Sequence, residues 1–173
     1  KYKTKKIKYC QIIGPSVYIW KKNKAIFINK NIDKIFSIFK IEHKFYNPKI
    51  YNYIGHPLLN KTIRNNKNFT KPKNIGFFLG SRSQEIVKNH EIIKELILKI
   101  IKYGKYQLHL FVTVEFKKFI KKNFNNFNNI KYHLNDRNYY KNISHLDFAF
   151  ACSGTVHLEL SFSNIPHFIF YKA

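Results

Sequence analysis

The residues best suited to chemistry lie in "GFFLGSRSQEI", residues 76–86, where an apolar run ends in Gly80, Ser81 and Arg82. Glycine lets a ligand approach the backbone closely, and serine can cap the helix predicted to follow. The planar guanidinium of arginine matches the oxygens of a phosphate group. This corner predicts a phosphate-binding loop, and a capped turn with a solvated arginine stays open as the alternative.

A second corner of the same kind occupies residues 152–159, "CSGTVHLE". A predicted buried strand runs directly into Ser153, Gly154 and Thr155, and the free N–H groups at the start of a helix attract anions. We expect Ser153 to be the N-cap of that helix and Glu159 to bind neutral hydroxyls such as those of a ribose. A solvated Glu159 on an outer face is the alternative. Together the two corners predict a clamp on a diphosphate.

Other motifs limit the chemistry further. Glycine-rich loops of the G-x-G-x-x-G or Walker type are absent from the sequence, so neither NAD nor P-loop ATP binding is indicated. The eight histidines follow no metal-ligand spacing, and we expect neither a metal site nor a cofactor. Cys10 and Cys152 form no C-x-x-C pair and are predicted to be half-buried thiols in a reducing compartment. No apolar run approaches about 18 residues, and no signal peptide is visible, which favours a cytoplasmic location.

The elements that must position both corners alternate between strands and helices, which predicts an α/β fold with parallel sheets. The predicted strands are 6–13, 33–39, 51–55, 75–80, 106–113, 130–134, 146–152 and 167–171. The predicted helical segments are 16–32, 41–47, 83–103, 114–123, 137–143 and 153–163. Both corners follow parallel strands at their carboxyl ends, where open α/β sheets bind ligands. Residues 60–74 are polar and aperiodic, and we interpret them as a linker between two domains.

The charge of the chain is strongly basic, with 32 Lys and Arg against 9 Asp and Glu and a net charge of +23. Such a balance is typical of proteins that bind nucleic acid or an anionic membrane. The excess is spread along the chain with abundant Asn, Ile, Phe and Tyr, so A/T-rich coding drift and selected anion binding both stay open. A nucleic-acid-binding protein is disfavoured, because the sequence shows no RNA module, helix-turn-helix or zinc knuckle.

Six segments match one family in order and at compatible spacing. "GPSVYIW" (14–20) is similar to S-P-S-V-W-A-W, "FKIE" with "FY" (39–42, 45–46) to L-P-F-E…F-Y, and "YIGHPL" (53–58) to V-G-H-P-L. "LGSRSQEI" (79–86) is similar to P-G-S-R-x-x-E-I, "CSGTVHLE" to A-S-G-T-x-x-L-E, and "PHFIFYK" (166–172) to P-x-V-V-x-Y-K. The chain resembles lipid-A-disaccharide synthase, a bacterial GT-B glycosyltransferase, along essentially all 173 residues. It departs from the family pattern at Gly14, Tyr18, Lys40 and Leu79.

The resemblance implies a GT-B-like fold with parts of two Rossmann-like domains. Residues 1–59 would be the C-terminal part of the acceptor-side domain, 60–74 the linker, and 75–173 the N-terminal part of the UDP-sugar donor-binding domain. The family transfers 2,3-diacylglucosamine from its UDP donor to 2,3-diacylglucosamine 1-phosphate (lipid X), giving lipid A disaccharide 1-phosphate and UDP. The implied partners are these two lipids and the anionic inner face of the inner membrane, with no nucleic acid.

The resemblance also implies the site residues. Arg82 would stabilise the charge that grows on the departing UDP, and Glu159 would meet the ribose. The implied UDP-binding residues are Gly80, Ser81, Arg82, Ser153, Gly154, Thr155 and Glu159. Family members extend beyond both ends of this sequence, so we expect the general base to lie outside it and this piece alone to be inactive. Another GT-B transferase, a nucleotide-sugar epimerase and an inactive remnant stay open, although "PSVYIW" and "IGHPL" favour lipid-A-disaccharide synthase.

Overall fold

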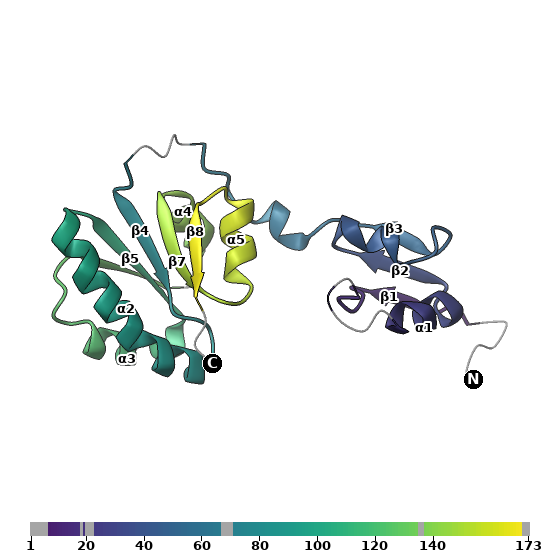
Figure 1. Cartoon of the computed structure of the whole chain (residues 1–173), viewed down its shortest axis with the longest axis horizontal. Coiled ribbons are helices and arrows are strands. Elements are labelled where there is room, and N and C mark those ends of the chain that lie inside the picture. Colours follow the sequence, from purple (N-terminus) through teal and green to yellow (C-terminus); the bar gives the residue numbers. More distant parts are fainter. Residues whose placement is uncertain (1–6, 18, 20–22, 67–70, 135–136, 171–173) are drawn as a thin grey trace. The chain divides into compact units, whose positions relative to one another are not determined.

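Two compact units make up the chain, Lys1–Leu59 and Asn60–Ala173. The computed structural model describes residues 7–17, 19, 23–66, 71–134 and 137–170. Each unit contains one parallel sheet with helices packed against it (Figure 1). The predicted α/β class with parallel sheets is therefore confirmed.

The first unit is built on the strands β1 (Cys10–Ile12), β2 (Lys34–Ser37) and β3 (Tyr51–Tyr53), which pair in that order. Helix α1 (Asn23–Asn31) covers a small core with Ala25 and Ile28. The predicted helix 16–32 is helical only over 23–31 among its described residues, because 17 and 19 lie in turns. The predicted helix 41–47 is a 3-10 helix, Lys40–Lys44, followed by Pro48, which disfavours helical backbone at the residue before it.

The second unit has a five-stranded sheet in the order β6-β5-β4-β7-β8, with every neighbouring pair parallel. Its strands are β4 (Asn74–Phe78), β5 (Gln107–Val112), β6 (Ile130–Leu134), β7 (Phe148–Cys152) and β8 (His167–Phe170). The chain runs outward from β4 to β6 and then returns to β7 on the other side of β4. The strand order therefore switches between β4 and β7, the place where doubly wound sheets bind ligands.

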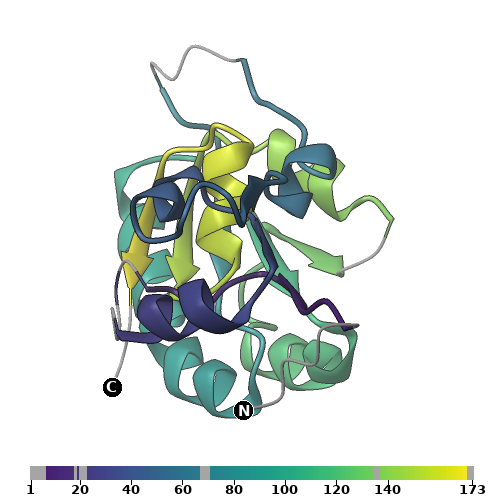
Figure 2. The same cartoon turned by 90° about the vertical axis from the view of Figure 1, so that its right-hand side faces the viewer.

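Helices cover both faces of this sheet, as Figure 1 and Figure 2 show from two directions. One face carries α2 (Ser83–Tyr103) and α3 (Lys117–Asn123), the other α4 (Tyr139–Ser144) and α5 (Val156–Phe162). Helix α2 forms because its apolar residues recur at helical spacing, and Ile86, Ile93 and Ile97 are buried against the strands. The predicted helix 114–123 begins instead as a 3-10 turn, Val114–Phe116, before α3.

Close packing at the centre of the sheet depends on Gly76 in β4. A Cβ atom at this position would lie 2.5 Å from the Cδ1 atom of Leu146, which is fully buried. Leu146 precedes β7, so this contact allows the two strands that carry the corners to lie side by side. The strands therefore end in the same layer with their loops adjacent.

The polar stretch 60–74 begins the second unit, and Asn65 joins it to the rest of that unit. The side-chain amide of Asn65 donates to the carbonyl oxygen of Leu146 at 2.7 Å, and its backbone N–H donates to Ser163 O at 2.8 Å. Asn164 donates in turn to the carbonyl of Asn65, and Asn65 is 3% exposed. Buried amide bonds of this kind fix the backbone, so the chain enters β4 from a defined position.

A polar cluster runs across the strands on the α4 side of the sheet. His109 Nδ1 lies 2.8 Å from His133 Nε2, and His109 Nε2 lies 3.2 Å from Asn74 Oδ1. Asn74 in turn donates to Asp147. Burial, followed by the nearby positive charges of His133 and Lys131, lowers the pKa of His109 to about 4. The imidazole is therefore neutral near pH 7.

The two cysteines differ from the prediction that both are half-buried. Both are free thiols, but Cys10 is exposed and Cys152 is 2% exposed. Cys10 lies on the edge strand β1, whereas Cys152 ends a strand covered on both faces. Over the described ranges, none of the helices has the length and apolar character needed to cross a bilayer.

Candidate functional site

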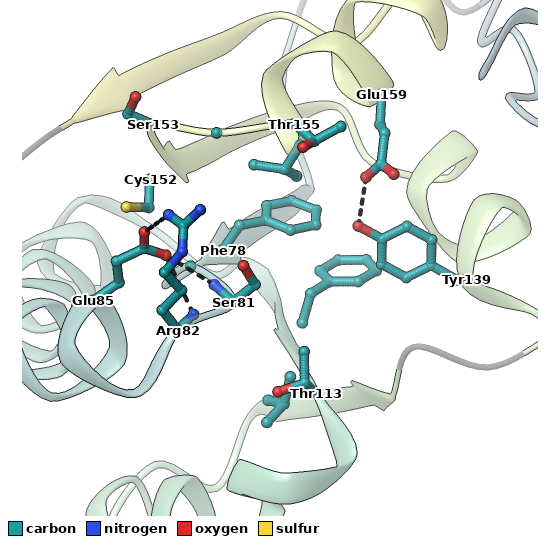
Figure 3. Close-up of a pocket in the computed structure, with 15 residues that line it drawn as sticks. Phe78, Ser81, Arg82, Glu85, Thr113, Tyr139, Cys152, Ser153, Thr155 and Glu159 are labelled. Atoms are coloured by element: carbon teal, nitrogen blue, oxygen red, sulfur yellow. Dashed lines mark hydrogen bonds and ion pairs between the residues drawn. The ribbon is translucent and has the colours of Figure 1, made fainter. Parts of the chain in front are cut away.

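One pocket opens at the carboxyl ends of β4, β5 and β7. The loops after β4 and β7 line it, together with the end of β5, the first residue of α4 and part of α5. The seven residues predicted from sequence all line this pocket: Gly80, Ser81, Arg82, Ser153, Gly154, Thr155 and Glu159. Figure 3 shows Arg82 and Glu85 on one side of it and Glu159 with Tyr139 on the other.

The loop after β4 is organised by Glu85, which the sequence reading did not single out. Its Oε2 atom accepts the backbone N–H groups of Ser81 at 3.1 Å and Arg82 at 3.3 Å. Its Oε1 atom lies 2.6 Å from Nη1 of Arg82 in an ion pair. Arg82 is the N-cap of α2 and Glu85 its third residue, so the carboxylate closes the helix start from within. Ser81, the predicted cap, instead donates its backbone N–H to the Glu85 carboxylate.

Gly80 makes room for this carboxylate. Its φ angle is +114°, a region that side chains rarely adopt, and a Cβ atom there would lie 2.6 Å from Oε2 of Glu85. Partial burial of Glu85 raises its pKa, but the hydrogen bonds from Arg82 and Ser81 outweigh it and lower the pKa overall. The carboxylate is therefore ionised near pH 7 and holds Arg82 in place.

Arg82 remains accessible despite its partner. Its side chain is 81% exposed and reaches the rim of the pocket. A guanidinium has five N–H donors, so a contact with one carboxylate oxygen leaves capacity for the oxygens of a phosphate. The structure thus places at the predicted position a cation whose direction is set by Glu85.

The loop after β7 is built differently. Helix α5 begins at Val156, and its N-cap is Thr155, whose side chain makes no capping hydrogen bond. The prediction that Ser153 is the N-cap is therefore wrong, because the chain needs two further residues before it turns into the helix. The backbone N–H of Ser153 instead donates to Phe170 O at 3.0 Å and extends the pairing with β8. Gly154 has a φ of +149° and open space around its Cα.

Glu159 is held by two tyrosines of α4. Tyr139 donates its hydroxyl to Oε2 at 2.8 Å, and Tyr140 donates to Oε1 at 3.3 Å. Glu159 is half-buried, so the alternative of a solvated side chain on an outer face does not describe it. Burial, and then the charge of Glu159, raises the pKa of Tyr139 well above its usual range.

Aromatic rings form the apolar part of the pocket wall. Phe78 and Phe111 stack with their centroids 4.3 Å apart, and the Tyr139 ring meets Phe111 edge-on at 5.8 Å. Phe78 and Phe111 are nearly fully buried. The hydroxyl of Thr113, at the end of β5, is buried without a hydrogen-bond partner. The pocket therefore joins a rim that carries the exposed Arg82 to an aromatic interior.

Asn89 ties the two loops together from beneath. Its side-chain amide donates to the carbonyl of Leu79 at 2.8 Å and to Sγ of Cys152 at 3.2 Å. Asn89 is 2% exposed. Leu79 precedes Gly80 and Cys152 precedes Ser153, so one amide spans both strand ends. The signal in the sequence was a polar residue on the apolar face of a long helix, between Ile86 and Ile93.

The two acidic residues of the first unit, Asp33 and Glu42, make local structural hydrogen bonds. Glu42 accepts a hydrogen bond from the Ser37 hydroxyl at 2.5 Å and is 2% exposed, and burial raises its pKa. Asp33 accepts the backbone N–H of Tyr9 at 2.9 Å. Among the described residues, no group of three or more His, Cys, Asp or Glu could hold a metal ion.

The fold identifies the class of protein to which the chain is similar. A solved structure of S. aureus TarM, in complex with fondaparinux, α-GlcNAc-glycerol and UDP, matches with a TM-score of 0.52. The match has 13% sequence identity and covers 94% of this chain and 36% of that one. The chain has the fold of GT-B glycosyltransferases, as predicted.

The family follows from sequence comparison. The chain belongs to the lipid-A-disaccharide synthetase family, whose model matches residues 1–173. It is 34% identical to a lipid-A-disaccharide synthase of Campylobacter jejuni (strain RM1221) over 97% of this chain, and 30% identical to one of Helicobacter acinonychis over 98%. It spans about half the length of these relatives, 46% in each case. The resemblance drawn from the six sequence segments is confirmed.

Proposed function

We propose that the protein transfers 2,3-diacylglucosamine from its UDP donor to lipid X, forming lipid A disaccharide 1-phosphate and UDP. Family membership supports the reaction, and one structural observation supports the site. Both strand-end loops, with all seven predicted residues, line a single pocket at the point where the strand order switches. Under this proposal the unit from Asn60 binds the donor, and the unit up to Leu59 contributes to the acceptor side.

The proposed chemistry places charge where the structure has a cation. A hydroxyl of lipid X attacks the anomeric carbon, its proton goes to a base, and the bond from that carbon to the UDP oxygen breaks. Negative charge then grows on the diphosphate, where Arg82 would stabilise it. Glu85 holds the guanidinium by an ion pair at 2.6 Å, so little reorganisation is needed during the reaction. Ser153, Gly154 and Thr155 would contact the diphosphate from the opposite loop, and Glu159 would bind the ribose.

Titration of UDP into the 173-residue chain tests this assignment directly. We expect saturable heat and a rise in melting temperature at up to millimolar UDP, both weakened in Arg82→Ala. The matched control is Arg64→Ala, which removes an exposed arginine of the same unit outside the pocket. No heat and no thermal shift at millimolar UDP would sink the donor assignment. An equal loss in both variants would point to bulk charge instead.

We also propose that the protein works on the cytoplasmic face of the inner membrane as a peripheral protein. The net charge of +23 supports attraction to anionic lipid, at about 1 kcal/mol for each Lys or Arg near the surface. Sedimentation with anionic and neutral vesicles at rising salt measures this attraction. We expect binding to anionic vesicles that weakens as salt rises. Equal, salt-independent binding to neutral vesicles would contradict the electrostatic part of the proposal.

A further inference from the structure

The carboxylate of Glu159 receives two unequal hydrogen bonds. The bond from Tyr139 is 2.8 Å long, near the usual length for a hydroxyl donor, whereas the bond from Tyr140 is 3.3 Å long. Tyr139 opens α4 and Glu159 lies in α5, so the shorter bond joins two helices that follow different strands. The direction of the carboxylate is therefore set mainly by Tyr139.

The ring of Tyr139 is itself fixed. It packs edge-on against Phe111, with the ring planes at 88°, and Phe111 stacks on the buried Phe78. The Tyr140 ring also packs edge-on against the Tyr139 ring, with the centroids 5.2 Å apart and the ring planes at 79°. The hydroxyl is thus presented from a rigid aromatic cluster that belongs to the pocket wall. Because the pKa of Tyr139 is raised by burial and by Glu159, the hydroxyl keeps its proton and remains a donor at neutral pH.

The carboxylate keeps capacity for a ligand. Its two oxygens offer about four lone-pair directions, and each oxygen accepts one tyrosine hydroxyl. Two directions are left, which suits the adjacent hydroxyls of a ribose. A carboxylate held in one orientation meets both hydroxyls without the entropy cost of fixing its own rotamer on binding.

We propose that Tyr139 is a positioning residue that orients the Glu159 carboxylate toward the ribose diol of the bound nucleotide. The proposal rests on the proposed function, because it takes a UDP-linked ligand in this pocket as given. It goes further by assigning the recognition of the 2′ and 3′ hydroxyls to a pair of residues. A tyrosine that merely satisfied its own hydroxyl would affect stability without affecting this recognition.

The test compares two ligands that differ only in the diol. UDP and 2′,3′-dideoxyuridine diphosphate are titrated into the 173-residue chain and into Tyr139→Phe, which keeps the ring and removes the hydroxyl. We expect Tyr139→Phe to weaken UDP binding about 3- to 10-fold, the range of one net hydrogen bond, and to leave dideoxy binding unchanged. Glu159→Gln should also lower the ratio of the affinity for UDP to the affinity for the dideoxy analogue. Adding Tyr139→Phe to Glu159→Gln should change this ratio little further.

The control is Tyr132→Phe, which removes a hydroxyl bound to the Phe124 carbonyl in the same sheet, outside this pocket. We expect it to leave the ratio unchanged. If Tyr139→Phe weakens both ligands equally, or weakens neither, the positioning role is overturned. UDP binding by the parent chain would still support the proposed function in that case. A parent chain that binds neither ligand would overturn both proposals.

Discussion

In the loop after β4, the carboxylate of Glu85 comes from the first turn of the helix that the loop opens, and it satisfies backbone N–H groups as well as Arg82. After the loop that follows β7, Glu159 also lies in the first turn of its helix, but its carboxylate is held by two tyrosines of another helix. The first loop is closed by local contacts. The second depends on how α4 and α5 pack on the sheet.

This difference suggests a division of labour in the pocket. The first loop presents an exposed guanidinium of fixed direction, which suits charge that develops during bond breaking. The second loop presents a glycine with open space, and the helix after it presents the Glu159 carboxylate with lone pairs left for a ligand, which suits a ligand already bound in the ground state. The same residue types at two strand ends thus support different roles.

The largest expected effect separates these roles by kinetics. Arg82→Ala should lower kcat about 10²-fold, since losing a comparable contact costs about 3 kcal/mol of transition-state stabilisation. Glu159→Gln should mainly raise KM for the donor, by about tenfold for one hydrogen bond to a charged group. Because we expect the 173-residue chain alone to be inactive, the two constants are measured by steady-state assays with both lipid substrates on a longer protein that contains these residues. If Arg82→Ala raises KM and leaves kcat unchanged, Arg82 only binds, and the division of labour fails.

A smaller effect compares the two glycines. Gly80→Ala meets a positive φ and a carboxylate oxygen at 2.6 Å, whereas Gly154→Ala meets a positive φ with nothing within 4 Å. Backbone strain costs about 1–3 kcal/mol, so Gly154→Ala should lower the free energy of unfolding by about 1 kcal/mol and Gly80→Ala by about 2–3 kcal/mol. Denaturant titration of each variant measures the difference. Equal losses would mean that Glu85 moves aside freely and does not hold the first loop.

The strands, the long helix and the two strand-end loops could be predicted well from the sequence, for physical reasons. Buried parallel strands such as 75–80 are short apolar runs, and α2 repeats isoleucines at helical spacing, so both patterns are strong. The loops follow from the strand ends, which is why all seven predicted residues reach one pocket. Helix starts were less accurate: Ser153 was predicted as a cap, yet α5 begins three residues later.

The partners of the site residues were the part that could not be predicted. Tyr139 and Glu159 are 20 positions apart, and their contact depends on two short helices packing on the same face of the sheet. Asn89 bridges Leu79 and Cys152 only because α2 crosses both strand ends. Glu85 was closer to prediction, since a carboxylate three residues after an N-cap is a local signal, but Ser81 was taken as the cap.

The smallest expected effect distinguishes the loops by pH. The folded pKa of Glu85 lies below 4.5, so its contribution to stability is present above that pH and is lost as pH falls through the lowered pKa. The folded pKa of Tyr139 lies above 10.0, so its contribution is present below that pH and is lost as pH rises through the raised pKa. Loss of the Glu85 contribution should therefore loosen the first loop in acid, and loss of the Tyr139 contribution should loosen the second loop in alkali.

Unfolding curves of the parent and of a loop variant are compared at each pH. Their difference separates the contribution of that loop from the contributions of other titrating groups. His109, with a pKa lowered to about 4, also destabilises the fold as pH falls below 6.5, but it does so equally in the parent and in a loop variant. The difference in unfolding free energy between the parent and Glu85→Gln should be about 0.5–2 kcal/mol near neutral pH, as for other helix caps, and should shrink in acid. The difference between the parent and Tyr139→Phe should shrink above pH 10. If the Glu85→Gln difference does not shrink in acid, the Glu85 carboxylate does not hold the first loop, and the contrast between the loops does not hold.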